Sequence, residues 1–392
     1  MSGGRRGWGR RRKAGQQPPG DVESAEDAAS GELAEGISYS VTKRDSADGV
    51  PAVNIHFTMT PEAKARWTLS AAYREKGETH PETLTAAYEL AEVLWVQGAA
   101  DEAVELFRYV VAGRRAVLGQ GHPDTLAATS YLARALEELG ATAEAEQLTR
   151  MVWAEHVRAS GEAHPEALTS LARLARLALR QNRAAEAESL ARQVLAARER
   201  VLGQGHRDTL GSRNDLAGAL RAQGRLDDAE WLYRQVADDA DRLLGPADPL
   251  SLKARANQAA VLAGQGRWAE AERHYRAVVD VRVRDTGADH VDTLSAQSNL
   301  ASVLHGTGKV DEAEALMRTV LAGYSTLLGT DHPRTVTAMR NLAAMTHRRG
   351  NRAEAEALCR RVVAAYERRF GPGDPRTAEA RANLRLVVEG GG

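Results

Sequence analysis

Two patterns of hydrophobic and polar positions divide the chain. From residue 37 to residue 59, apolar side chains alternate with polar ones, which predicts two β-strands. The alternating residues are Ile37, Tyr39 and Val41 in the first run, and Val53, Ile55, Phe57 and Met59 in the second. The connection from Thr42 to Ala52 is too long for a two-residue turn, so we expect a loose hairpin. From residue 60 onward, the apolar positions have helical spacing.

The helical part repeats every 42 residues without insertion or deletion. The clearest element is the stretch Gly119-Gln-Gly-His-Pro-Asp-Thr-Leu126, and its fourth position defines what we call the junction residue of each unit. The junction residues are His80, His122, His164, His206, Asp248, His290, His332 and Asp374. A fixed period of this length predicts an elongated array in which each unit packs on its neighbours.

Each unit holds two helices. The first begins after the junction residue and ends near a residue able to adopt positive φ: Gly98, Gly140, Asn182, Gly224, Gly266, Gly308 and Gly350. The second carries a Glu-Ala or Asp-Ala pair, whose alanine allows close helix packing, and then a valine seven residues after that alanine. We therefore predict seven helix pairs over residues 80–373, a half-repeat helix at 61–76 and a last helix at about 376–388, with the two ends acting as caps.

These motifs resemble the tetratricopeptide repeat, in the long 42-residue form of the kinesin light chain-like group. The resemblance rests on Asn299-Leu300-Ala301, Asn341-Leu342-Ala343 and the Leu118-Gly119 to Leu126 junction. It implies an all-α fold: a right-handed α-solenoid of about seven helix pairs with half-repeat caps, preceded by a small β-hairpin and a disordered tail. The predicted domains are residues 1–36, 37–59 and 60–389.

Composition adds no strong bias. The formal net charge is −1, 43% of residues are hydrophobic and only 5% are aromatic, which suits helices packed through small side chains. The single cysteine, Cys359, excludes an internal disulfide, and no run of 18 apolar residues occurs. We expect a cytoplasmic protein.

The N-terminal tail splits into a basic half and an acidic half. Arg5, Arg10 and Lys13 belong to the first half, whereas Asp21 and Glu35 mark the second. This composition predicts disorder. The tail either solubilises the protein or contacts RNA or an acidic partner. The hairpin after it either caps the array or adds a strand to a partner.

Two recurring polar positions have structural and functional interpretations. Because Asp248 and Asp374 replace histidine at the junction, helix capping is favoured over a metal site. An arginine recurs at 108, 150, 192, 234, 276, 318 and 360, four residues after a glutamate in six of the seven cases. This spacing predicts a solvated row of ion pairs, with a phosphate-binding stripe as the alternative.

Nothing in the sequence points to catalysis. The phosphate-binding loop GxxxxGK[ST], the nucleophile motif GxSxG, the zinc motif HExxH and paired cysteines are all missing. The chain is therefore expected to be non-catalytic, without a cofactor or metal.

Candidate binding residues come from the resemblance. It implies that positions five, eight, nine and twelve after each junction residue face a concave groove. The candidates are Arg134, Arg173, Arg176, Asn214, Lys253, Asn257, Asn299, Ser302, Arg340 and Asn341. Asparagine can bond both groups of a peptide backbone, and arginine can bind a carboxylate with two hydrogen bonds. Alternatively, the asparagines only hold neighbouring helices together.

The groove is expected to have two polar sectors, since Glu89, Glu92 and Tyr131 occupy the same positions in the first units. An acidic or C-terminal peptide would suit units four to seven. We therefore expect an adaptor that binds a protein or peptide. The competing hypotheses are a regulatory or sensor arm of a signalling or defence system, docking through the hairpin, an enzyme with an unrecognised site, and nucleic-acid binding through the basic residues.

Overall fold

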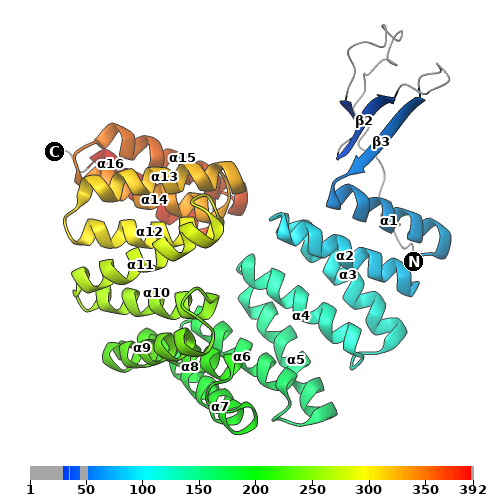
Figure 1. Cartoon of the computed structure of the whole chain (residues 1–392), viewed down its shortest axis with the longest axis horizontal. Coiled ribbons are helices and arrows are strands. Elements are labelled where there is room, and N and C mark those ends of the chain that lie inside the picture. Colours follow the sequence, from blue (N-terminus) through cyan, green and yellow to red (C-terminus); the bar gives the residue numbers. More distant parts are fainter. Residues whose placement is uncertain (1–29, 35, 45–51, 390–392) are drawn as a thin grey trace. The chain divides into compact units, whose positions relative to one another are not determined.

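The computed structural model describes residues 30–34, 36–44 and 52–389. The chain divides into two compact units, residues 1–93 and 94–392, with the boundary inside one helix. Figure 1 shows their elements in chain order.

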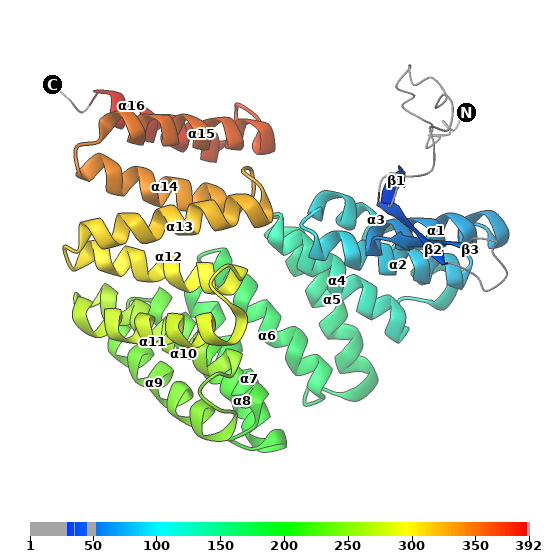
Figure 2. The ribbon, with the colours of Figure 1, turned by 45° about the horizontal axis from the view of Figure 1, so that its top comes forward.

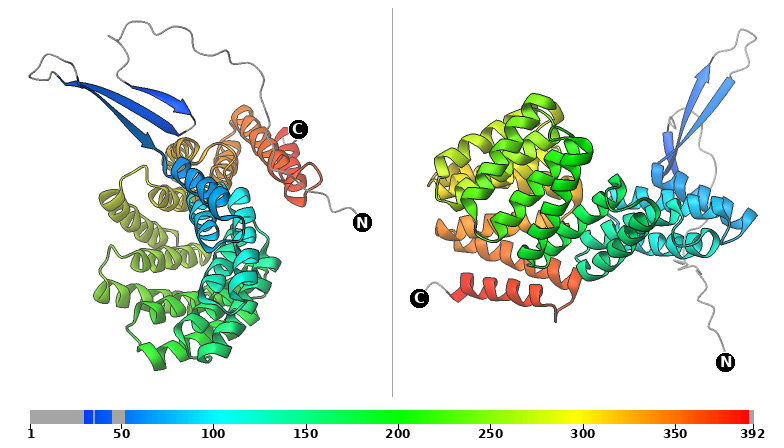
Figure 3. Two further views of the ribbon diagram at one scale, coloured as in Figure 1. Left: turned by 90° about the vertical axis from the view of Figure 1, so that its right-hand side faces the viewer. Right: turned by 90° about the horizontal axis from the view of Figure 1, so that it is seen from below.

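The first unit begins with a three-stranded antiparallel sheet, β1 (Ser30–Ala34), β2 (Ile37–Arg44) and β3 (Ala52–Met59), in the order β1-β2-β3 (Figure 3). The register of β2 and β3 runs from Ile37 opposite Met59 to Arg44 opposite Ala52, so both predicted strands are confirmed. The prediction of disorder up to residue 36 is wrong for β1. Its sequence lacks the β-branched alternation that identified the other strands. The basic and acidic blocks over residues 1–29 lie outside the described residues.

Helix α1 (Pro61–Lys76) follows the sheet and begins as its sequence predicts. The Thr60 side chain accepts a hydrogen bond from the Ala63 backbone N–H at 3.2 Å, and Pro61 occupies the first helical position. Gly77 ends the helix with φ 89° and ψ 173°, a conformation in which a side chain would be strained.

Seven pairs of successive helices and a last helix follow. The pairs are α2 (Pro81–Val96) with α3 (Ala100–Leu118), α4 (Pro123–Glu138) with α5 (Thr142–Ser160), α6 (Pro165–Arg180) with α7 (Ala184–Leu202), α8 (Arg207–Ala222) with α9 (Leu226–Leu243), α10 (Pro249–Gly264) with α11 (Trp268–Thr286), α12 (Val291–Gly306) with α13 (Val310–Leu328), and α14 (Pro333–Arg348) with α15 (Arg352–Phe370). Helix α16 (Pro375–Glu389) ends the array. The predicted number of pairs and the two terminal helices are confirmed.

Within the second unit, each helix packs on the next in sequence, and Figure 2 shows the layers from α11 to α16. Even-numbered helices of neighbouring pairs also contact one another: α6 with α8, α8 with α10, and α12 with α14. Within the described residues, neighbouring odd-numbered helices make no comparable contacts. The even-numbered helices therefore lie on the inner side of the stack.

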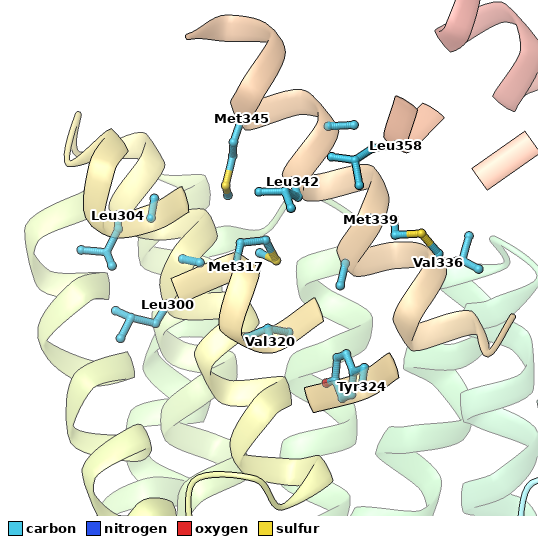
Figure 4. Packing of buried hydrophobic residues seen from close by; sticks show 14 of the residues in the cluster. Leu300, Leu304, Met317, Val320, Tyr324, Val336, Met339, Leu342, Met345 and Leu358 are labelled. Carbon is cyan, nitrogen blue, oxygen red and sulfur yellow. The ribbon is translucent and has the colours of Figure 1, made fainter. Parts of the chain in front are cut away.

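The core depends on small residues at the predicted positions. The seven alanines of the Glu-Ala and Asp-Ala pairs are all fully buried: Ala103, Ala145, Ala187, Ala229, Ala271, Ala313 and Ala355. Larger side chains fill the space beside them. In the C-terminal pairs, Met317 and Val320 of α13 meet Met339 and Leu342 of α14 (Figure 4). Each pair thus covers an apolar face of its neighbour, which no single pair can bury alone.

The junction residues cap the even-numbered helices, as predicted. Nδ1 of His122, His206, His290 and His332 accepts the backbone N–H two residues later at 3.2 Å in each case. Asp248 accepts the equivalent bond from Leu250 N–H at 2.8 Å. Histidine and aspartate are interchangeable here because both place an acceptor at the start of the helix.

The recurring arginines bind carboxylates of two successive helix pairs. All six predicted pairs with the glutamate four residues earlier are present, from Arg150–Glu146 to Arg360–Glu356. Four arginines also bind an acidic residue of the next helix pair: Arg108–Glu144, Arg150–Glu186, Arg276–Glu312 and Arg318–Glu354.

The predicted solvated row of ion pairs is wrong in one respect, because the carboxylates are largely buried. Glu146, Glu188, Glu272 and Glu314 have side chains that are 7–16% exposed, and each also accepts a bond from the turn of the next pair. We call these four the shared glutamates. For Glu272 the donors are Arg276 of its own helix and Lys309 Nζ at 2.6 Å. The shared glutamates therefore link consecutive pairs.

The capping role gives a first prediction. Replacing His290 by alanine should lower the free energy of unfolding by about 1 kcal/mol, since the Asp292 N–H loses its acceptor. His290→Asp should retain stability, as Asp248 does at the same position of another unit. Thermal unfolding of the three proteins measures this, and equal melting temperatures for the alanine and aspartate variants would contradict it.

The shared glutamates give a second prediction. Glu272→Ala should lower the free energy of unfolding by about 1–3 kcal/mol at pH 7, because two charged donors lose a buried acceptor. Glu105→Ala, at an exposed position, should have an effect within about 0.5 kcal/mol.

The effect of Glu272→Ala should depend on pH. The hydrogen bond from Lys309 holds the pKa of Glu272 below its ordinary value of 4.5. Burial opposes this shift, and the hydrogen bond from Arg276 adds to it. The carboxylate therefore stabilises the fold above pH 4.5, and this contribution is lost as the pH falls through the lower folded pKa. Denaturant unfolding at pH 7 and below pH 4 should show the difference between wild type and variant shrink. A constant difference would contradict this origin.

Candidate functional site

The candidate site is the inner face of the even-numbered helices, which we define by positions five, eight, nine and twelve after each junction residue. Position nine carries asparagine in four successive units: Asn257 on α10, Asn299 on α12, Asn341 on α14 and Asn383 on α16. Asn383 is not among the residues predicted from the sequence, although it lies a further 42 residues after Asn341.

The four asparagines are not equivalent. Asn257 Nδ2 donates to Oδ1 of Asn214 at 3.1 Å, and Asn214 is only 3% exposed. Asn299 and Asn383 are exposed and Asn341 is half-buried, and within the described residues none of these three has a hydrogen-bond partner. Asn214 and Asn257 therefore hold α8 to α10, whereas the other three amides are available to a ligand.

Small side chains surround these amides. Position twelve is Ser302 on α12 and Ala344 on α14, and position five is Ser295 on α12. The hydroxyl of Ser302 donates to the Ser298 carbonyl of its own helix at 3.1 Å. Ser302 therefore has less capacity to donate to a ligand, but its side chain is small and stays close to the helix backbone. A polypeptide backbone can approach such a surface closely.

Two cations flank the asparagines. Lys253 on α10 is exposed, and the described residues provide no ion-pair partner for it. Arg340 on α14 is 46% exposed, with Nη1 3.5 Å from the Tyr366 hydroxyl and Nη2 3.9 Å from Glu379. Both contacts are long, so the guanidinium retains donors for an anionic ligand.

The inner face of α4 and α6 differs, since its three predicted candidates are all arginines. Arg134 lies over the ring of Trp95, 4.4 Å from its centroid. Arg173 donates to the Ser130 carbonyl at 3.2 Å, and Arg176 pairs with Asp215 at 3.0 Å. In the first repeat, Glu89 and Glu92 lie on α2 at positions nine and twelve after the junction residue.

Other kinds of site receive little support. The described residues contain no group of three or more His, Cys, Asp or Glu side chains that could hold a metal ion. Burial raises the pKa of the Cys359 thiol, which makes it less reactive. Among the described helices, none is both long and apolar enough to cross a bilayer.

Known sequence profiles match most of the helical part of the chain. The profile of the tetratricopeptide repeat matches residues 82–151, 208–282, 250–325 and 292–368, and a second tetratricopeptide repeat profile matches 167–208. No curated protein sequence matches the chain.

Several solved structures are similar to parts of the chain. Nearly identical tetratricopeptide-like repeats of a putative kinesin light chain from Podosopora anserina are 29% identical, covering 52% of this chain and 97% of that one, with a TM-score of 0.46. A tetratricopeptide repeat protein from Parabacteroides merdae is 15% identical, covering 78% and 98%, with a TM-score of 0.49. A Rap protein complexed with competence and sporulation factor is 13% identical, covering 84% and 99%, with a TM-score of 0.45.

The inequivalence of the asparagines is testable. Asn257→Ala should lower the free energy of unfolding by about 1–2 kcal/mol, because the buried Asn214 Oδ1 loses its donor. Asn299→Ala should change it by less than about 0.5 kcal/mol. Denaturant unfolding of both variants checks this, and similar losses would show that Asn299 also holds helices together.

Proposed function

Since the chain belongs to the tetratricopeptide repeat family, a protein-interaction scaffold, we propose that it is a non-catalytic adaptor that binds an extended polypeptide along the inner face of α10 to α16. The observation that carries this proposal is the set of unpartnered amides at Asn299, Asn341 and Asn383. Amides that no group of the protein engages keep their donors and acceptors for a ligand, and three of them at one repeat position favour an external partner.

The geometry suits an extended chain. Contacting helices lie about 10 Å apart, which an extended polypeptide spans in about three residues. Asn299 on α12 and Asn341 on α14, whose helices contact each other, would therefore be about three residues of ligand apart, and the four positions from α10 to α16 about nine if each step has the same length. Each amide can donate to a backbone carbonyl and accept from a backbone N–H, so such binding does not require a particular side chain.

Charge adds selectivity. Lys253 and Arg340 flank the amides, and only long contacts to Tyr366 and Glu379 engage Arg340. An acidic segment or a free C-terminus would complete their coordination. We therefore propose an acidic or C-terminal peptide as the ligand of this sector.

The test uses the variant Lys253→Glu, Asn299→Ala, Arg340→Glu. Random dodecapeptides displayed on phage would be selected on the wild-type chain, and the enriched peptides would be titrated against both proteins. We expect acidic peptides to be enriched and the variant to bind them at least tenfold more weakly, because charge-assisted bonds are replaced by repulsion. Helical content and melting temperature would be measured alongside.

A matched control changes equivalent residues elsewhere. Arg273→Glu, Arg361→Glu, Gln193→Ala also reverses two cations and truncates one amide, at exposed positions of odd-numbered helices. It should bind as wild type does. Equal binding by wild type and the inner-face variant would contradict the proposal.

The alternative function is a regulatory or sensor arm that docks through the N-terminal sheet. Its specific support is that β3 is an outer strand of the sheet, with one edge unpaired within the described residues. Such an edge can accept a strand of another protein. Removal of residues 1–59 should abolish binding if this alternative holds, while the inner-face variant would still bind.

A further inference from the structure

The arginines on the inner face of α4 and α6 have a different environment from all the recurring arginines of the odd-numbered helices. Arg134 is exposed but held in place: its guanidinium carbon lies 4.4 Å from the centroid of the Trp95 ring and 5.3 Å from that of Tyr131. Stacking on two rings restricts the side chain while leaving the edge of the guanidinium plane open to hydrogen bonding.

The two rings are themselves fixed. Tyr131 meets Trp95 edge to face, with centroids 5.8 Å apart, and packs at 5.8 Å on the fully buried Phe107. The Trp95 indole N–H donates to Glu138 Oε2 at 2.6 Å. Glu138, four residues after Arg134, would be the natural ion-pair partner of that arginine. Within the described residues Glu138 is bound to Trp95, and Arg134 forms no ion pair.

Two further arginines from α6 lie beside Arg134. Arg173 is largely buried, with Nη2 3.5 Å from Glu137 and with Nε lacking an acceptor in the described residues. Burial lowers the pKa of Arg173 to about 10, opposed by Glu137, and repulsion from Arg176 and Arg134 adds to this effect. Arg173 thus contacts Ser130 and Glu137 of α4, on either side of Arg134 in the sequence, and both Arg134 and Arg176 repel it.

The carboxylates that these arginines contact on α4 to α8 do not balance the charges of Arg134, Arg173, Arg176 and Arg180. Arg173 and Arg180 share Glu137, Arg176 pairs with Asp215, and Arg134 contacts neither carboxylate. Adding Glu138 still leaves one positive charge in excess. By contrast, every recurring arginine from Arg108 to Arg360 on the odd-numbered helices is within 4 Å of a carboxylate. The proposed phosphate stripe on those helices therefore has little free charge, and the excess lies at Arg134.

We propose that Arg134, held by Trp95 and Tyr131, forms with Arg176 and Arg173 an anion subsite on the inner face of α4 and α6, which takes a carboxylate or phosphate group on a side chain of the bound polypeptide. Guanidinium binds both groups with paired hydrogen bonds, and phosphate offers a third acceptor oxygen. The inference rests on the proposed peptide binding and adds a second contact outside the asparagine sector.

The test uses three sets of synthetic peptides of about 30 residues, so that about 15 residues on either side of one fixed central residue can reach from α6 to α16. The peptides are degenerate except for that residue, which is phosphoserine, glutamate or glutamine. Fluorescence anisotropy would measure their binding to the full chain. Wild type should bind the phosphoserine and glutamate sets at least tenfold more tightly than the glutamine set. Tighter binding of phosphoserine than glutamate would identify phosphate as the preferred group, and equal binding a carboxylate.

Variants locate this preference. Arg134→Gln with Arg176→Gln should remove it, so that this protein binds all three sets with similar affinity. Arg134→Lys should retain part of it, because the charge remains but the planar fork is lost. The control Arg273→Gln with Arg361→Gln removes the same charge from odd-numbered helices and should keep the preference. Its persistence in the Arg134→Gln, Arg176→Gln protein, or equal binding of all three sets by wild type, would overturn the inference.

The two proposals fail differently. If the variant at Lys253, Asn299 and Arg340 still binds all peptides while Arg134→Gln, Arg176→Gln loses the anion preference, the asparagine sector is wrong and the subsite stands. If the first variant loses the glutamine set and the second retains the preference, peptide binding stands and the subsite is wrong.

Discussion

The structure depends on the close approach of two helices at a fully buried alanine in every pair. Seven alanines from Ala103 to Ala355 occupy this contact, with no exposed surface. A larger side chain there would separate the helices, and from α10 to α16 the shift would pass to the next pair because these pairs share one apolar core (Figure 4).

Packing of successive helices also brings the shared glutamates to their partners. Glu272 accepts from Arg276 on its own helix and from Lys309, 37 residues later, because α11 packs on α12 and Lys309 follows α12 in the chain. The same geometry recurs at Glu146 with Arg183, at Glu188 with Arg225 and at Glu314 with Arg349. Thus the recurring charges of the odd-numbered helices serve the stack itself.

This division of roles leaves the even-numbered helices free to differ. Their first residues are constrained by capping and their buried faces by packing, but positions five, eight, nine and twelve differ between the N-terminal and the C-terminal units. Unpartnered amides gather on α12 to α16 and unbalanced arginines on α4 and α6. A ligand that contacts both sectors would be recognised through its backbone in one and through a charged side chain in the other.

The sequence by itself determined the period, the seven pairs, the two terminal helices and the caps, because these depend on helical spacing and on residues at most four apart. Tertiary structure decided which polar residues were already engaged. Asn257 and Asn299 occupy the same repeat position. In the repeat before Asn257, position eight is Asn214, which accepts its hydrogen bond, whereas in the repeat before Asn299 it is Ala256, whose side chain cannot accept one. Only the stacking of α8 on α10 brings that partner within 3.1 Å. Strand β1 was not predicted because its sequence has only a weak local signal, and its pairing with β2 is what makes it a strand. The second partners of the shared glutamates were not predicted because they are 35–37 residues away in the sequence, and only helix packing brings them together.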